Sequence, residues 1–168
     1  NAEQSPLPNC HHNYRLVYDA LEKQQTKIAV LQFGGPLTRN LDGITHGYHT
    51  LSHHGGYPER IYELEVIDDK ILGGLRKFVR DLKQGGLLDD TIVLFHCGMA
   101  DASAHSNKNG AAFLFGGGFK HKTHIKCADY KGVKYSSSQL FSSVLKQSGF
   151  RDLKFNGNTT VIPELFGA

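Results

Sequence analysis

A run of histidines between residues 46 and 56 carries the side chains best suited to chemistry. His46, His49, His53 and His54 lie in it, out of ten histidines in the chain. Imidazole is the commonest metal ligand among side chains and the usual acid or base near neutral pH. His49 and His53 are four positions apart, so a single helical turn would place both rings on one face. The alternative is a polar loop whose histidines cap backbone groups.

A metal site needs three or four converging N, O or S donors, with one position open if it is catalytic. Further candidate ligands are therefore sought later in the chain. The histidine spacing does not match the metalloprotease motif HExxH, since Thr50 stands where that motif requires Glu. The candidate metal ligands are His49, His53, His105, His54, His96 and Asp101.

Apolar periodicity predicts the elements that must position these side chains. Helical spacing predicts helices over residues 12–25, 58–84 and 136–147. Short apolar runs predict buried strands over residues 27–33, 91–95 and 111–115. Pro58 is suited to the first turn of the long helix, and Gly85 with Gly86 to its end. Gly73 and Gly74 should weaken or bend that helix unless something packs closely against them.

The remaining segments complete the predicted architecture. Residues 1–10 are expected to form an extended arm, 119–135 a β-hairpin or a long loop, and the C-terminal tail is expected to fold back on the domain. A strand, a crossover helix and a second strand form a βαβ unit, which predicts a single α/β domain over residues 1–168 with a mainly parallel sheet flanked by helices. In such sheets chemistry gathers at the carboxyl ends of the strands. The two histidine-bearing loops should therefore share one edge.

Composition limits the classes of function. The chain has 168 residues, a net charge of +3 and 39% hydrophobic residues, which suits one globular domain. No Lys/Arg run is dense enough for nucleic-acid binding, and no apolar run approaches the roughly 20 residues of a membrane-spanning helix. Three isolated cysteines do not decide the redox compartment.

Beyond these patterns, residues 47–55 (Gly-Tyr-His-Thr-Leu-Ser-His-His-Gly) resemble the signature of a family of uncharacterised, usually exported bacterial proteins in the alkaline phosphatase and sulfatase superfamily. The match continues in order through residues 86–91, residues 99–106 and the glycine-ended apolar segment 111–118. It covers roughly residues 14 to 150. The resemblance implies a mainly parallel sheet, an alkaline-phosphatase-like site that often holds two metals, and hydrolysis of phosphate or sulfate esters.

The resemblance also implies ligand positions. His49 and His53 take the place of the family's first Asp–His pair, His96 stands at the second position, and His105 is the distal histidine. Two departures weaken this site. His96-Cys97-Gly98 replaces the usual Asp or Asp-His, and His49 replaces an Asp, which favours a zinc-like metal as the cofactor. The superfamily nucleophile belongs to an N-terminal half that this sequence lacks, so the chain resembles a C-terminal half.

Two functions of different class follow. The first is a degenerate or partial member of the superfamily that serves as an accessory or structural subunit of a larger exported assembly. The alternative is a metal-dependent phosphate- or sulfate-ester hydrolase whose nucleophile comes from the missing N-terminal half. Either interpretation implies another protein chain, or that missing half, as the partner, and a periplasmic or extracellular location. Nucleic-acid binding and a membrane-spanning segment are not expected.

Overall fold

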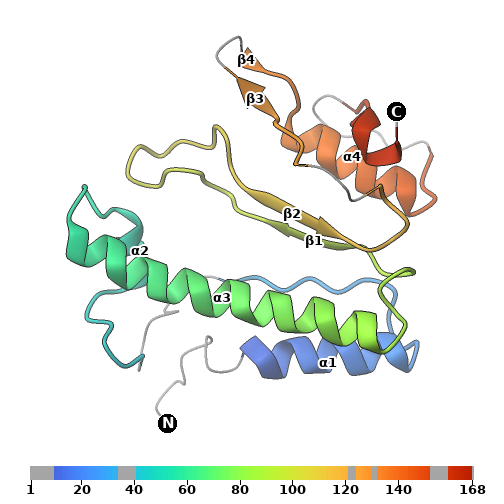
Figure 1. Cartoon of the computed structure of the whole chain (residues 1–168), viewed down its shortest axis with the longest axis horizontal. Helices are drawn as coiled ribbons and strands as arrows, with labels where there is room; N and C mark the ends of the chain where they lie inside the picture. The colour runs from blue at the N-terminus through green and yellow to red at the C-terminus, as the bar shows by residue number, and fades with distance from the viewer. Residues whose placement is uncertain (1–9, 34–40, 121–123, 130–131, 152–158, 168) are drawn as a thin grey trace. The chain divides into compact units, whose positions relative to one another are not determined.

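The computed structural model describes residues 10–33, 41–120, 124–129, 132–151 and 159–167. Its elements in chain order are α1 (Cys10–Glu22), α2 (Tyr48–Ser52), α3 (Pro58–Gln84), β1 (Val93–His96), β2 (Ala112–Phe115), β3 (Ala128–Asp129), β4 (Gly132–Val133), α4 (Ser137–Gln147) and a 3₁₀ turn, η1 (Pro163–Phe166) (Figure 1). The chain divides into two compact units. Unit 1 comprises Asn1–Gly85 and Asp101–Ser106, and unit 2 comprises Gly86–Ala100 and Asn107–Ala168.

Helix α3 is the main element of unit 1 and confirms the predicted long helix. Pro58 occupies its first turn beside Glu59, and Lys83 lies in its last turn, so both ends carry the charge that the helix dipole favours. One face is buried along its length, through Glu63, Ile67, Ile71, Gly74, Leu75, Phe78 and Leu82. The spacing of three and four residues between these positions is that of an amphipathic helix.

Helix α1 packs against α3 and confirms the predicted N-terminal helix, although it starts earlier and ends at Glu22. Tyr14 is buried and stacks on Phe78 with a ring-centroid distance of 4.9 Å. At the end of α3, the Tyr18 side chain occupies the place that a Cβ at Gly85 would take. A side chain at position 85 would therefore require the Tyr18 side chain to move.

Unit 2 contains a two-stranded antiparallel sheet in which β1 pairs with β2, with Val93 opposite Phe115 and His96 opposite Ala112. The glycines after β2 turn the chain back, and Gly116 has a φ of +69°. A Cβ at Gly116 would collide with the carbonyl oxygens of Leu88 and Thr91, so this position requires glycine. Strands β3 and β4 form a second, short antiparallel pair, which is the first of the two alternatives, a β-hairpin or a long loop, predicted for residues 119–135.

Helix α4 begins with a capping box, in which the Ser136 hydroxyl accepts from the Gln139 backbone N–H and the Gln139 side chain accepts from the Ser136 N–H.

The C-terminal tail packs on the hydrophobic core of unit 2, as predicted. Phe119, Ile162 and Leu165 are buried together, and the half-buried residues packed against them are Ile92, Leu114, Ile125, Tyr135, Leu140, Val144 and Phe166.

The predicted mainly parallel α/β sheet is wrong. The strands in the described part of the chain form two separate antiparallel pairs, and most of its regular secondary structure is helical. No strand forms over residues 27–33, where Ile28 is 73% and Val30 is 84% exposed. Strand formation depends on a neighbouring strand, and within the described residues no strand pairs with this run. Instead of pairing with a strand before α3, β1 pairs with β2, which follows it along the chain. Of the extended arm predicted over residues 1–10, residues 1–9 lie outside the described residues, and Cys10 begins α1 instead.

Candidate metal-binding site

The short helix α2 brings His49 and His53 together. Their ring centroids are 4.7 Å apart, which confirms that one helical turn places both on a common face. Leu51, between them in sequence, is completely buried and fixes α2 to unit 1, where α2 contacts α3. The helix ends at His53, whose backbone N–H donates to the His49 carbonyl over 3.2 Å.

A loop from Asp101 to Ser106 adds a third ring to this pair. The His105 and His53 ring centroids are 4.8 Å apart. The loop is closed by two backbone hydrogen bonds between Asp101 and Ser106, of 2.8 and 3.2 Å. Ser103 ties it to α2 by donating its hydroxyl to the Ser52 carbonyl over 3.4 Å. The sequence separation of more than fifty residues between His53 and His105 is thus bridged within unit 1.

The backbone of this loop is unusual at His105, where φ is +49°. This left-handed conformation is uncommon for a residue with a Cβ and is found most often where surrounding contacts enforce it. Asp101 contributes to that enforcement, since its Oδ1 accepts a hydrogen bond from the Ala104 N–H over 3.1 Å. The described contact of the Asp101 carboxylate therefore shapes the loop.

The other predicted ligands have different surroundings. The Nδ1 of His54 accepts from the Gly56 N–H over 3.0 Å, which is the backbone-capping role that sequence inspection left open for this loop. His96 belongs to unit 2, at the end of β1, where its Nε2 lies 3.2 Å from the Ser137 hydroxyl. Of the six candidate ligands, the structure gathers His49, His53 and His105.

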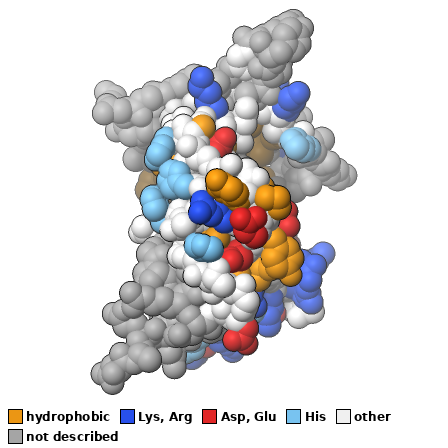
Figure 2. Space-filling view, turned by 90° about the vertical axis from the view of Figure 1, so that its left-hand side faces the viewer, with side chains coloured by type: hydrophobic (Ala, Val, Ile, Leu, Met, Phe, Trp, Pro, Cys, Tyr) orange, Lys and Arg blue, Asp and Glu red, His pale blue; other side chains and the backbone are white. Residues whose placement is uncertain are grey.

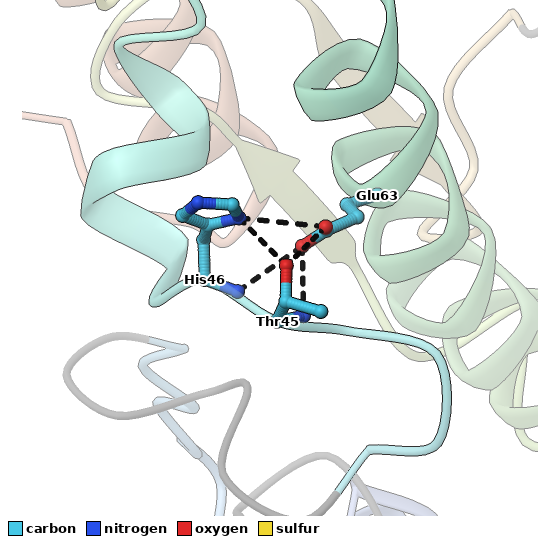
Figure 3. Close-up of polar contacts among 3 residues, drawn as sticks. All are labelled: Thr45, His46 and Glu63. Atoms are coloured by element: carbon cyan, nitrogen blue, oxygen red, sulfur yellow. Dashed lines mark hydrogen bonds and ion pairs between the residues drawn. The ribbon is translucent and has the colours of Figure 1, made fainter.

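The chain leading into α2 is held by Glu63, a buried carboxylate on α3 (Figure 3). Its oxygens accept from the Thr45 hydroxyl over 2.6 Å, the Thr45 N–H over 2.9 Å and the His46 N–H over 3.1 Å. The Nδ1 of His46 lies 3.4 Å from the same carboxylate. These hydrogen bonds, above all that of the Thr45 hydroxyl, lower the pKa of Glu63 to about 2 despite its burial.

Sequence inspection did not identify Thr45 or Glu63 as part of the site. A signal was present, because Glu63 precedes Ile67 and Ile71 at intervals of four and so occupies the buried stripe of α3. A buried carboxylate needs hydrogen-bond donors, and unpaired backbone N–H groups of a neighbouring loop can supply them. That reasoning predicts a docked loop but does not say which loop.

The His53 ring lies from each of the other two rings at a distance that metal ligands also show, but the three rings do not converge on one metal position. Two imidazoles on one tetrahedral zinc place their ring centroids about 5 Å apart when each Zn–N bond is about 2.0–2.1 Å, close to the distances found here. Within the residues that the structure describes, no group of three or more His, Cys, Asp or Glu side chains could hold a metal ion as it stands. His49 and His105 are exposed, so their rings can turn. Figure 2 shows several histidine side chains exposed on the face that it draws.

Comparison with known proteins gives no relative for this chain. No protein-family model, curated protein or solved structure matches it significantly. No helix in the described residues is both long and apolar enough to cross a membrane.

Proposed function

We propose that unit 1 binds one zinc-like divalent metal through His49, His53 and His105. The observation that carries this proposal is the position of His53, with a histidine ring from α2 at 4.7 Å and another from the 101–106 loop at 4.8 Å. Two of these rings share a helical turn and the third comes from a hydrogen-bonded loop. Binding requires a rotation of exposed side chains and leaves the buried Leu51 anchor in place.

The donor set fits a borderline metal. Imidazole nitrogen suits zinc and its neighbours, whereas calcium and magnesium prefer oxygen ligands. Three protein nitrogens leave a fourth tetrahedral position, which a water, a substrate or a side chain from another chain could fill. The residues of this chain would position the metal: Glu63 holds the segment before α2, and Ser103 ties the His105 loop to it.

We further propose that the chain is a degenerate or partial relative of alkaline phosphatases and sulfatases that acts as an accessory or structural subunit of an exported assembly. This part rests on the sequence resemblance over residues 47–55 and 99–106. It is supported by the His96-Cys97-Gly98 run, which stands where active members of that superfamily carry a metal-binding Asp. Its expected partner is another protein chain, and its expected location is periplasmic or extracellular.

The alternative function is ester hydrolysis, favoured by the coordination position that three histidines leave open. A bound metal would supply Lewis-acid stabilisation of charge on a phosphate or sulfate ester. The nucleophile would come from a further polypeptide segment. Hydrolysis of aryl phosphate and aryl sulfate by the metal-loaded chain, assayed together with the polypeptide that copurifies with it, distinguishes the two functions. The hydrolase function predicts turnover that the His49→Ala/His53→Ala substitution abolishes. The accessory function predicts no turnover that depends on these two histidines.

The metal itself is tested by elemental mass spectrometry on protein isolated without added metal or chelator. We expect near-stoichiometric zinc, manganese or iron in the native chain and its loss from the His49→Ala/His53→Ala variant. The matched control is His54→Ala, which removes a histidine of the same loop whose Nδ1 is engaged by the Gly56 N–H. Absence of metal from the native chain, with no binding on titration, would contradict the proposal.

A further inference from the structure

The side of α3 opposite its buried face carries a second regular stripe. An α-helix turns by about 100° per residue, so positions separated by three and four residues fall on one side. The stripe consists of Tyr62, Glu65, Asp69, Leu72, Gly73, Arg76, Arg80 and Lys83, and all of these residues are exposed. It includes two large hydrophobic side chains, Tyr62 at 66% and Leu72 at 38% exposure.

The charges of this stripe are segregated along the helix. Glu65 and Asp69 lie in its first half, whereas Arg76 and Arg80 lie in its second half. Each pair has like charges four residues apart, a spacing that destabilises an isolated helix. Lys77 shows the contrasting arrangement on another side of α3, where it forms an ion pair of 2.6 Å with an aspartate four residues later.

Neither of two ordinary explanations accounts for this segregation. The helix dipole acts within the first and last turns, and Asp69 and Arg76 lie well inside a helix of 27 residues. Pairing within the chain does not explain it either, because among the described residues none of Glu65, Asp69, Arg76 and Arg80 forms an ion pair. The acidic and basic halves are therefore available to a complementary surface.

We propose that this stripe binds a second copy of the same chain, with the two α3 helices antiparallel and a two-fold axis between Leu72 and Gly73. In this register Asp69 of one copy faces Arg76 of the other, and Glu65 faces Arg80. A two-fold axis forms every such pair twice, so the unfavourable like-charge spacing within one helix becomes a complementary pattern between two. At the ends, Tyr62 faces Lys83, a cation–π geometry.

The crossing point has the residue that close packing requires. Gly73 lies in the middle of α3, where glycine weakens a helix, and no atom lies within 4 Å of the place that a Cβ would occupy. Close packing within the described chain therefore does not explain why glycine stands at position 73. Opposite Leu72 of a second copy, this open position admits the leucine side chain and brings the helix axes to the short end of the usual spacing of about 8–10 Å.

The proposed interface is small, with eight residues on each copy against about 20–30 a side in a standard interface. Its charged pairs lie at the surface, where salt screens them. We therefore expect a weak dimer that dissociates on dilution and at high ionic strength. Sedimentation equilibrium of the full chain, from micromolar to millimolar concentration at low and high salt, measures this directly.

Charge reversal tests the register. Arg76→Glu/Arg80→Glu and Glu65→Arg/Asp69→Arg each place like charges opposite one another, and each should weaken self-association by roughly a hundredfold or more. An equimolar mixture of the two variants should form a heterodimer, because each then carries the charge that the other lacks. Far-UV circular dichroism checks that each variant keeps its helices, and recovery in the mixture shows that both remain folded at α3.

The matched control is Lys70→Glu/Lys77→Glu, which makes the same change in net charge as Arg76→Glu/Arg80→Glu. Both lysines lie on α3 outside the stripe. It should leave self-association within about threefold of the native value, since long-range charge effects are screened. A chain that stays monomeric at millimolar concentration in low salt would overturn the proposal. So would a dimer that persists in either charge-reversed variant, or charge-reversed variants that fail to associate with each other.

Discussion

Each unit contains a carboxylate with a pKa of about 2, but the physical causes differ. In unit 1, Glu63 is buried and accepts mainly from the neutral Thr45 hydroxyl and from backbone N–H groups. In unit 2, Glu164 accepts from Lys134 Nζ and from the Tyr135 hydroxyl, both over 2.6 Å. Lys134 is the largest cause of the lowered pKa of Glu164, and its side chain is 58% exposed.

The difference shows how the two units hold their chain segments. Glu63 replaces the water that the backbone of residues 45 and 46 would otherwise bind, and so fixes the approach to the histidines of α2. Glu164 joins the η1 turn to the chain after β4 through a largely exposed ion pair, and such pairs add little stability. Hydrogen bonds from neutral donors to an ionised carboxylate therefore support the candidate site, whereas a solvent-screened ion pair supports the tail of unit 2.

The largest expected effect is the loss of a core anchor in either unit. Leu51→Ala in unit 1 and Ile162→Ala in unit 2 each remove a side chain that is at most 2% exposed. We expect each to lower the free energy of unfolding by about 2–5 kcal/mol, measured by urea denaturation. Only Leu51→Ala should also weaken zinc binding, because Leu51 fixes α2. Equal weakening by Ile162→Ala would mean that the site does not belong to unit 1 alone.

A smaller effect is expected from the cap of α4. Ser136→Ala removes the side-chain oxygen that accepts from the Gln139 N–H, and should cost about 1 kcal/mol of unfolding free energy. Ser148→Ala, at the other end of the helix, removes an exposed hydroxyl that donates to the Val144 carbonyl and should cost less. Denaturation of both variants under the same conditions makes the comparison. A larger loss from Ser148→Ala would contradict the capping box.

The sequence predicted helices more reliably than sheets here, for reasons visible at particular residues. The apolar spacing of α3 and that of α4 are local patterns, so they predicted both helices. The run 27–33 has the composition of a strand, but strand formation depends on a partner that composition does not name. The parallel sheet was inferred from the strand predicted over that run. Because this strand does not form, the sheet edge that the two histidine-bearing loops were expected to share is also absent from the described structure.

The candidate site was predicted in part for the same reason. The approach of His49 to His53 follows from one helical turn and was visible in the spacing. His105 was a candidate ligand, but its approach to His53 depends on the 101–106 loop packing with unit 1. Contacts across so many residues are tertiary, and no local pattern encodes them. Glu63 was missed because its hydrogen-bond donors belong to a loop without a distinctive sequence signal.

The smallest effect expected concerns acid and salt. Both pKa values lie below the ordinary value of 4.5, so each carboxylate stabilises the fold above about pH 4.5 and loses that contribution as the pH falls towards 2. Added salt should raise the pKa of Glu164 more than that of Glu63, because salt screens the lysine charge. NMR titration of the side-chain carboxyl carbons at low and high salt measures both. A larger salt shift at Glu63 would reverse the assignment of causes.

The most direct test of the central claim is a zinc titration of the full chain by calorimetry, comparing His105→Ala with His54→Ala. His105 is remote in sequence from α2 and joins His53 only through the fold, whereas His54 is adjacent to His53 but caps a turn. The three-histidine site predicts one zinc per native chain, at least tenfold weaker binding in His105→Ala, and nearly native binding in His54→Ala. Native binding in His105→Ala, or no zinc binding by the native chain, would contradict it.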